Sequence, residues 1–303
     1  GDVYKRQVLG VTAILLAGAF FFVRINPACR QNLAVHHAQY QELAEALSEG
    51  KVSVGDAEKV LLAVKNPYDT IALQAAGIGY RADYAYHDGK YYVYFGIVPV
   101  LLLYLPYYLL TGGALQNYVA VFVFFAGFII AAAGFVYELM KRYFKEQPFY
   151  LWAVGTGMLV GSYSMFYLLI RPDLYHVPIV ASAMFATGGL WLYLAGLNRP
   201  KKAVGLYAFG SFCMALTAGC RPQFILFAAL AVVLFWERVF VKRELFSKKG
   251  WRQTAALVVP YVLIAAGLMA YNALRFGSPF DFGASYSMTS NDMTPVSYTH
   301  LTL

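Results

Sequence analysis

Charged residues, cysteines and metal-binding motifs are all scarce in this chain. Only 13% of its 303 residues are Asp, Glu, Lys or Arg, whereas a soluble domain carries about 25%. The three cysteines, Cys29, Cys213 and Cys220, have no C-x-x-C spacing and indicate neither a zinc site nor a disulfide framework. An Asp-x-Asp motif is also missing. We therefore expect no metal ion and no cofactor.

Apolar residues dominate instead. Hydrophobic types make up 60% of the sequence and aromatic types 17%, and the mean hydropathy is +0.54. They occur in long blocks, which is typical of membrane-spanning helices and excludes disorder. The formal charge of +8 does not indicate a nucleic-acid partner, because membrane proteins concentrate Lys and Arg in cytoplasmic loops. The composition predicts an all-α, multi-pass membrane protein.

Both ends of the chain resemble translated sequencing adapter. We give Gly1–Gln7 and about Val296–Leu303 no structural or functional weight, and we expect the chain to be a fragment.

Eight apolar blocks are candidates for membrane spans, since a helix needs about 20 apolar residues to cross. They are Val8–Val23, Tyr92–Leu110, Tyr118–Tyr137, Tyr150–Ile170, Val177–Leu197, Ala203–Cys220, Gln223–Glu237 and Thr254–Leu274. A signal peptide is the alternative for the first block, although Pro27 and a poor cleavage site make it the weaker choice.

The Lys and Arg residues of the short loops indicate the orientation of the second half. Twelve of them fall between spans on one side and only Arg171, Arg221 and Arg275 on the other. By the positive-inside rule, the loop at 171–176, residues 221–222 and the segment after Leu274 face outward.

The first loop, Arg24–Tyr91, is too long for its charges to indicate a side. Strict alternation over eight spans would put it in the cytoplasm. An outside location needs one crossing more or fewer between Tyr92 and Ile170. Pro99, Pro106 and the Thr-Gly-Gly at 111–113 could break that region into short or re-entrant pieces.

Within this loop, His36–Gly50 has the apolar stripe of an amphipathic helix, and Asp56 is placed to cap a second helix at Ala57–Lys65. We expect both helices to lie along the membrane surface.

The segment that follows, 80–96, packs Asp83, His87, Asp88 and Lys90 among seven aromatic residues that include Tyr92. An aromatic belt with a tight Asp88-Gly89 turn is one interpretation. A carboxylate at the lip of a cavity, with aromatic faces for a sugar ring, is the other.

Four motifs occur in an order that resembles one family. They are Asp88-Gly-Lys-Tyr-Tyr-Val-Tyr-Phe-Gly-Ile-Val-Pro, Arg171-Pro-Asp-Leu-Tyr, Cys220-Arg-Pro and Tyr271-Asn-Ala-Leu-Arg-Phe-Gly-Ser-Pro-Phe-Asp-Phe-Gly. Over roughly residues 30–290 the chain is similar to an uncharacterised bacterial group of GT-C membrane glycosyltransferases, of the dolichyl-phosphate-mannose and aminoarabinose transferase type.

This resemblance implies a GT-C-like helical bundle in a bacterial plasma membrane, with a large extracytoplasmic first loop that carries membrane-parallel helices. It also implies sugar transfer from a polyprenyl-phosphate donor at the outer face. The family places an acidic residue soon after the first span, in an Asp-Glu-x-x-Tyr-like segment. The stretch His36-His37-Ala-Gln-Tyr40 has no acid, so the catalytic base shifts to Asp83 or Asp88.

The residues that would bind substrate are charged or polar groups at the outer ends of the spans. They are Arg171, Asp173, Tyr175, His176, Arg221 and Arg275, together with Lys90 and Tyr92. A carboxylate would take the acceptor's hydroxyl proton, and a guanidinium would hold the departing lipid phosphate. For Arg171 and Arg221, a structural role at the membrane interface is an equal alternative. For Arg275, a structural role in the turn-rich segment that ends the last span is the safer interpretation.

The predicted organisation is linear, with the first span at 8–23, a long loop at 24–91, about seven spans over 92–274 and an outer loop at 275–295. The alternative function is a non-catalytic scaffold or a transporter in envelope assembly. Charges at span ends and the lack of an internal repeat disfavour transport. The expected partners are a polyprenyl-phosphate-linked sugar donor and membrane lipid, whereas the sequence indicates neither the acceptor nor the oligomeric state.

Overall fold

The computed structural model describes residues 2–30, 38–162, 164–248 and 250–289. It is mostly helical, with 74% of residues in helices and few in strands. The chain divides into two compact units. The first contains residues up to 36 and 116–265, and the second contains residues 37–115 and those from 266 onward. Two parts of the sequence-based predictions lie outside the described residues. They are the C-terminal end at 296–303, and His36 and His37 at the start of the predicted amphipathic helix.

Six helical stretches of the described chain are long and apolar enough to cross a membrane. They are Val3–Ile25, Asn117–Tyr143, His176–Asn198, Pro200–Cys220, Pro222–Val241 and Trp251–Phe276. These six correspond to six of the eight predicted spans, which confirms a helical membrane protein.

The other two predicted spans, Tyr92–Leu110 and Tyr150–Ile170, form shorter apolar helices, Ile97–Thr111 and Phe149–Ser162. The first begins late because residues 90–92 belong to a strand. It ends at Gly112, whose φ of 66° is the left-handed conformation that terminates helices. The second is interrupted before Ser164, which has a φ of 52°.

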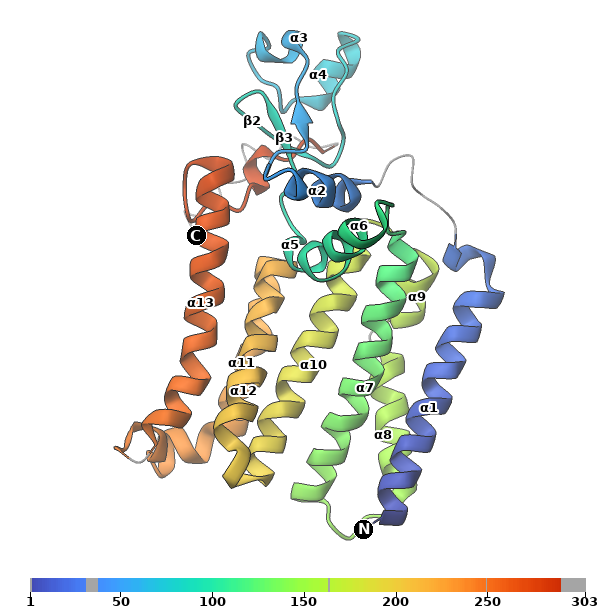
Figure 1. The fold of residues 1–303 in the computed structure, drawn as a ribbon, viewed down its shortest axis with the longest axis vertical. Helices are drawn as coiled ribbons and strands as arrows, with labels where there is room; N and C mark the ends of the chain where they lie inside the picture. The colour runs from blue at the N-terminus through green and yellow to red at the C-terminus, as the bar shows by residue number, and fades with distance from the viewer. Residues whose placement is uncertain (1, 31–37, 163, 249, 290–303) are drawn as a thin grey trace. The chain divides into compact units, whose positions relative to one another are not determined.

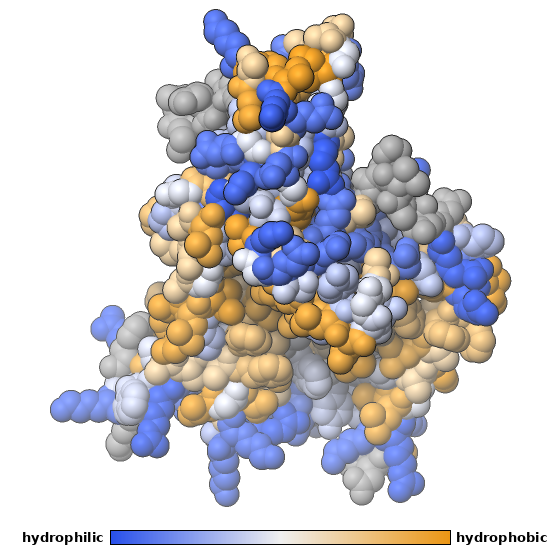
Figure 2. Space-filling view, turned by 45° about the horizontal axis from the view of Figure 1, so that its top comes forward, coloured by the Kyte–Doolittle hydropathy of each residue, from blue (hydrophilic) through white to orange (hydrophobic). Residues whose placement is uncertain are grey.

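The first unit is a bundle whose helices run side by side in Figure 1. Its helices are α1 (Asp2–Ile25), α7 (Asn117–Tyr143), α8 (Phe149–Ser162), α9 (Met165–Ile170), α10 (His176–Asn198), α11 (Ala203–Cys220) and α12 (Ala229–Trp236), and the first part of α13 (Trp251–Phe276) also belongs to it. Short helical turns join them: η1 (Pro27–Arg30), η3 (Pro200–Lys202), η4 (Pro222–Ala228), η5 (Glu237–Val241) and η6 (Glu244–Phe246). In Figure 2 apolar residues cover much of this bundle and hydrophilic residues project beyond its lower end.

Small residues allow the central helices of this bundle to pack closely. α10 packs against both α7 and α11. Where α10 meets α11, a Cβ added to Gly189 would lie 2.9 Å from the carbonyl oxygen of Gly210. Only glycine permits this backbone approach, which is a common basis of helix association in membranes.

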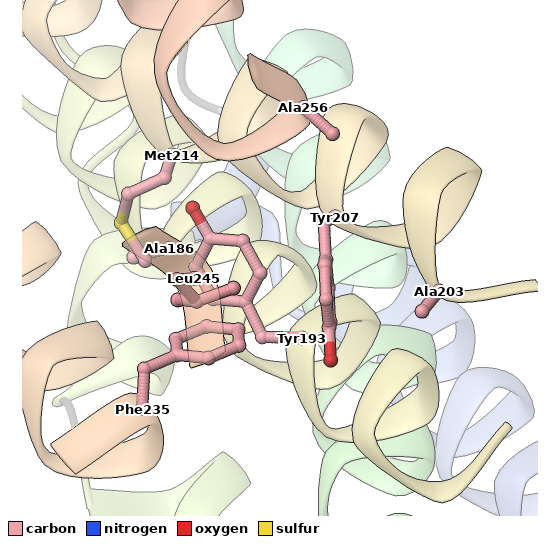
Figure 3. Close-up of a cluster of buried hydrophobic side chains, with 8 residues drawn as sticks. All are labelled: Ala186, Tyr193, Ala203, Tyr207, Met214, Phe235, Leu245 and Ala256. Atoms are coloured by element: carbon pink, nitrogen blue, oxygen red, sulfur yellow. The ribbon is translucent and has the colours of Figure 1, made fainter. Parts of the chain in front are cut away.

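A buried aromatic cluster joins α10, α11 and α12 in the first unit (Figure 3). The ring centroid of Phe235 lies 5.4 Å from that of Tyr193 and 5.0 Å from that of Tyr207, both edge to face. The Tyr193 hydroxyl hydrogen-bonds with Ser211 at 2.9 Å, and Arg238 donates to the Tyr207 hydroxyl at 2.9 Å. The polar ends of these rings therefore have partners although the rings are buried.

The second unit combines short helices with a small antiparallel sheet. Its helical segments are α2 (Gln39–Ser48), α3 (Lys59–Leu62), α4 (Thr70–Ala75), α5 (Ile97–Pro99), the π-helical turn η2 (Val100–Tyr104), α6 (Leu105–Thr111) and η7 (Ala284–Tyr286), together with the end of α13. The strands are β1 (Gly55–Asp56), β2 (Ala85–His87) and β3 (Lys90–Tyr92), in the order β1-β3-β2.

The chain after α13 returns to this sheet. Ser287 bridges to Ala85, the Met288 amide donates to the Tyr84 carbonyl at 2.8 Å, and the Asp83 amide donates to the Met288 carbonyl at 2.9 Å. The long first loop and the segment after the last long helix therefore build one unit, whereas the sequence analysis treated them as separate regions.

The two helices predicted in the first loop have different outcomes. The amphipathic helix at His36–Gly50 is confirmed as α2, which buries Tyr40, Leu43 and Ala44. The prediction for Ala57–Lys65 is wrong in extent, because α3 covers only Lys59–Leu62. Asp56 does not cap it, since Asp56 pairs with Lys90 in the sheet. The residue that caps a helix here is Asp69, whose carboxylate accepts from the Ala72 amide at 3.0 Å.

Candidate functional site

Four of the predicted substrate-binding residues lie together at one end of the first unit, in the turn between α9 and α10. Asp173 Oδ1 accepts from the amides of Tyr175 at 2.9 Å and His176 at 3.1 Å. It also lies 3.2 Å from His176 Nδ1, which itself contacts the carbonyl of Arg171. A carboxylate that binds the first amides of a helix stabilises its positive end. Asp173 therefore holds the start of α10, and it shapes the turn that carries Arg171.

The fifth residue of this end, Arg221, comes from the junction of α11 and η4. Its guanidinium carbon lies 5.6 Å from the ring centroid of Tyr175. The guanidinium carbon of Arg171 lies 5.8 Å from the Tyr167 ring, and the Arg171 side chain is exposed. Among the described residues Arg171 forms no ion pair with a carboxylate. The structure thus brings two arginines, each beside a tyrosine, to the same end of the bundle.

The predicted acids lie in the second unit, and neither is deeply buried. Asp88 and Gly89 form the turn between β2 and β3, with φ angles of 47° and 77°. Positive φ at both central residues is typical of a tight hairpin turn, so the tight-turn interpretation of Asp88-Gly89 describes the backbone here. The Asp88 side chain is 88% exposed and lies 3.5 Å from His87 Nε2. Asp83 also has a left-handed φ, 61°. Its amide donates to the carbonyl of Met288, in the segment that follows α13.

Tyr92 is buried and forms part of an aromatic cluster in the second unit. Its ring centroid lies 5.4 Å from that of Phe276, which in turn lies 5.2 Å from Tyr286. His87 completes the cluster, with its ring 4.5 Å from Tyr286. Burial raises the pKa of Tyr92, and so does the nearby Asp88 carboxylate. These rings contact each other, so they form a packed core for the sheet.

Arg275 is 4% exposed, and its Nη atoms donate to acceptors of the second unit, whereas its buried Nε atom has no hydrogen-bond partner among the described residues. It donates to the Val93 carbonyl at 2.7 Å and to Asn272 Oδ1 at 2.7 Å, and its guanidinium lies 4.0 Å from the Tyr271 ring. Asn272 in turn donates to the Pro279 carbonyl at 3.2 Å. These contacts join the end of α13 to the exit of β3.

A polar network that the sequence analysis did not find connects α2 to the segment before β2. Glu42 accepts hydrogen bonds from Arg81 and, at 2.8 Å, from the Tyr84 hydroxyl. The Arg81 guanidinium also lies 4.0 Å from the Tyr84 ring. Burial, followed by the Glu42 carboxylate, raises the pKa of Tyr84. Residues so far apart in sequence carry no local signal of their pairing.

Glu42 also lines a polar cavity with a volume of about 510 Å³. Three further acids, Glu45, Glu49 and Asp56, and two lysines, Lys51 and Lys90, contribute to its walls. This places Lys90 on a polar cavity of the second unit. No group of three or more His, Cys, Asp or Glu side chains in the described part of the chain could hold a metal ion.

A buried acid, Glu138, lies in the first unit, at the end opposite Arg171 and Arg221. Glu138 is 2% exposed, pairs with Arg199, and accepts from Asn198 Nδ2 at 2.8 Å. A buried carboxylate needs such partners to remain charged. Glu138 thereby connects the end of α7 to the end of α10.

The apolar helices and the polar turns between them define a helical membrane protein. Comparison with protein-family models, with curated protein sequences and with solved structures gives no match. The function must therefore be argued from the residues themselves.

Proposed function

We propose that this protein is a membrane glycosyltransferase of the GT-C type, which transfers a sugar from a polyprenyl-phosphate donor to a cell-envelope acceptor at the extracytoplasmic face. The observation that carries the proposal is the group Arg171, Tyr175 and Arg221 at one end of the apolar bundle. Arginines at the end of membrane-spanning helices lie at the depth of lipid phosphates, and they stay charged there.

In the proposed mechanism Arg171 and Arg221 bind the phosphate of the donor lipid. A guanidinium can form two parallel hydrogen bonds with a phosphate, and its charge stabilises the lipid phosphate as it departs. A carboxylate accepts the proton of the acceptor hydroxyl as that oxygen attacks the anomeric carbon. Asp83 and Asp88 are the predicted bases, and Glu42 joins them because it lines a polar cavity beside a tyrosine and an arginine.

The helix lengths support a crossing number that suits this mechanism. α8 and α9 both pack on α7, and together they can make one interrupted crossing, whereas Ile97–Thr111 is short and broken by a π-helical turn. Six long helices and one interrupted crossing make seven in total. With seven crossings, the first loop and the turn at 171–176 face the outside while the cation-rich loops face the cytoplasm.

The proposal is tested with purified protein in lipid nanodiscs, a polyprenyl-phosphate sugar and an acceptor extract. Arg171→Gln and Arg221→Gln are expected to lower turnover at least tenfold, because each removes a charge from the phosphate site. Lys201→Gln, an exposed cation at the other end of the bundle, is the matched control and should retain activity. Asp83→Asn, Asp88→Asn and Glu42→Gln then identify the base.

A non-catalytic scaffold is the second candidate, and specific contacts favour it. Asp173, His176 and Arg275 all have structural bonds that account for them without a ligand. A scaffold predicts no turnover with any donor, and it predicts that the arginine variants bind donor lipid as well as the wild type does. Equal lipid binding by wild type and both variants would therefore refute the transferase proposal.

A further inference from the structure

A cationic pocket lies at the end of the first unit that carries Glu138, opposite to the proposed transfer site. It has a volume of about 380 Å³ and is lined by Lys141, Arg142, Tyr143, Lys145 and Asn198. Three of these five side chains are cations and none is a carboxylate. Glu146, the acid of the same loop, is exposed and does not line the pocket.

The hydrogen-bond donors of Arg142 are only partly paired. Its Nε atom is buried and has no hydrogen-bond partner among the described residues. Its Nη1 atom donates to the Leu197 carbonyl and to Asn198 Oδ1, both at the long distance of 3.4 Å. A buried donor without an acceptor is costly. An anionic group in the pocket would compensate the charge of Lys141, Arg142 and Lys145, which no lining carboxylate balances.

An apolar groove of the same unit is lined by residues of α1, α7 and α10. Its volume is about 370 Å³, and Leu9, Thr12, Ile130 and Gly134 are among its lining residues. Lys5, Glu138 and Arg199 also line it. The charges of Glu138 and Arg199 compensate each other in their ion pair, and Lys5 adds one cation to the wall of the groove.

Asn198 connects the two spaces. It lines the cationic pocket, and its side-chain amide donates to Glu138 at the end of the apolar groove. A molecule that fits both spaces needs an anionic head and a hydrocarbon tail.

We propose that the cationic pocket and the apolar groove together bind one anionic phospholipid, with its phosphate against Arg142, Lys141 and Lys145 and an acyl chain along the groove. Cations between membrane helices bind anionic headgroups in this way. The positive-inside rule explains cations at this end of the bundle, but it does not explain a buried guanidinium donor beside a hydrocarbon-sized groove. The site is separate from the transfer site and does not depend on the proposed activity.

The test measures lipid binding to the purified protein by native mass spectrometry. Phosphatidylglycerol is expected to bind at one molecule per chain, at least tenfold more tightly than phosphatidylcholine. Lys141→Gln with Lys145→Gln should remove most of this preference, and both side chains are exposed, so folding is preserved. The matched control, Lys201→Gln with Lys202→Gln, removes the same charge from the same end outside the pocket and should keep the preference.

The groove is tested with Thr12→Trp, which fills it with an indole ring. This variant should weaken phosphatidylglycerol binding at least fivefold, whereas Ile14→Trp should not, because Ile14 lies on the same helix and is 70% exposed outside the groove. Equal loss in the pocket variant and its control, or no preference over phosphatidylcholine, would overturn the proposal. Binding of glycerol phosphate as tight as that of phosphatidylglycerol would also overturn it, because the site would then take a free phosphate ester.

Discussion

Arg275 and Arg171 have the same side chain and lie at similar positions in the sequence pattern, after an apolar helix. Each lies beside a tyrosine ring, but their burial and hydrogen bonds differ. Arg275 is buried and donates to a backbone carbonyl and an amide oxygen, whereas Arg171 is exposed beside one tyrosine ring. A buried guanidinium with these acceptors stabilises the fold, and an exposed one at a helix end is available to a ligand. Residue type alone could not separate the two roles, because burial depends on segments far away in the chain.

Tyr68 provides a pH-dependent test of the second unit. Burial raises the pKa of Tyr68 to about 12, with further contributions from neighbouring tyrosines and from Asp88 and Asp281. In the unfolded chain a tyrosine ionises near pH 10. The unfolded chain therefore loses its proton first as the pH rises, and the stabilising contribution of neutral Tyr68 is complete below pH 10 and is lost towards pH 12.

We expect thermal stability to fall between about pH 10 and pH 12, and to fall less steeply in Tyr68→Phe. Tyr150→Phe is the control, because Tyr150 is 63% exposed. Melting temperature in detergent, followed by intrinsic fluorescence at each pH, is the measurement. A slope that is identical in wild type and Tyr68→Phe would show that Tyr68 does not contribute.

At the scale of elements, local signals located one helix, although they put its start too early at Tyr92, and failed for another. The helix that follows the aromatic segment begins after Gly96, which has a φ of 82°. An added Cβ there would lie 2.5 Å from the Tyr40 hydroxyl oxygen, so the turn also needs space for α2. By contrast, Asp56 suggested a helix cap but pairs in the sheet with Lys90, a partner that lies in a distant segment. Local propensity fails where such non-local pairing is stronger.

Gly96→Ala is expected to destabilise the second unit by about 2 to 4 kcal/mol, through a left-handed φ and a steric clash with the buried Tyr40. Gly112→Ala is the matched control. Gly112 has a φ of 66° and nothing within 4 Å of an added Cβ, so only the backbone term of about 1 kcal/mol should remain. Chemical unfolding in mixed detergent micelles measures both variants. Equal losses would mean that the contact with Tyr40 adds nothing.

For the whole molecule, the main question is how many times the chain crosses the membrane. Seven crossings place Glu146 and Lys248 on the cytoplasmic side and Asp88 and Ser278 outside. We expect single cysteines at Glu146 and Lys248 to react with a membrane-impermeant maleimide only in inverted vesicles. Cysteines at Asp88 and Ser278 should react in intact cells.

The background for this labelling has Cys29, Cys213 and Cys220 replaced by alanine, of which Cys29 and Cys220 are buried. Labelling of the Asp88 cysteine only in inverted vesicles would contradict the seven-crossing arrangement. It would also separate the predicted base from the outer face and remove it from the proposed mechanism.

Hydrophobic run length was enough to predict a helical membrane protein and the six long helices of the described chain. The apolar stripe predicted the amphipathic helix α2, and the Asp-Gly pair favoured a turn at Asp88-Gly89 as one of two interpretations. Each of these follows from forces that act within a short stretch of chain. The sequence did not reveal the Glu42–Arg81–Tyr84 network, the return of residues 287–288 to the sheet, the burial of Arg275 or the pocket around Arg142. All four depend on contacts between segments distant in sequence, and such contacts form only when packing brings those segments together.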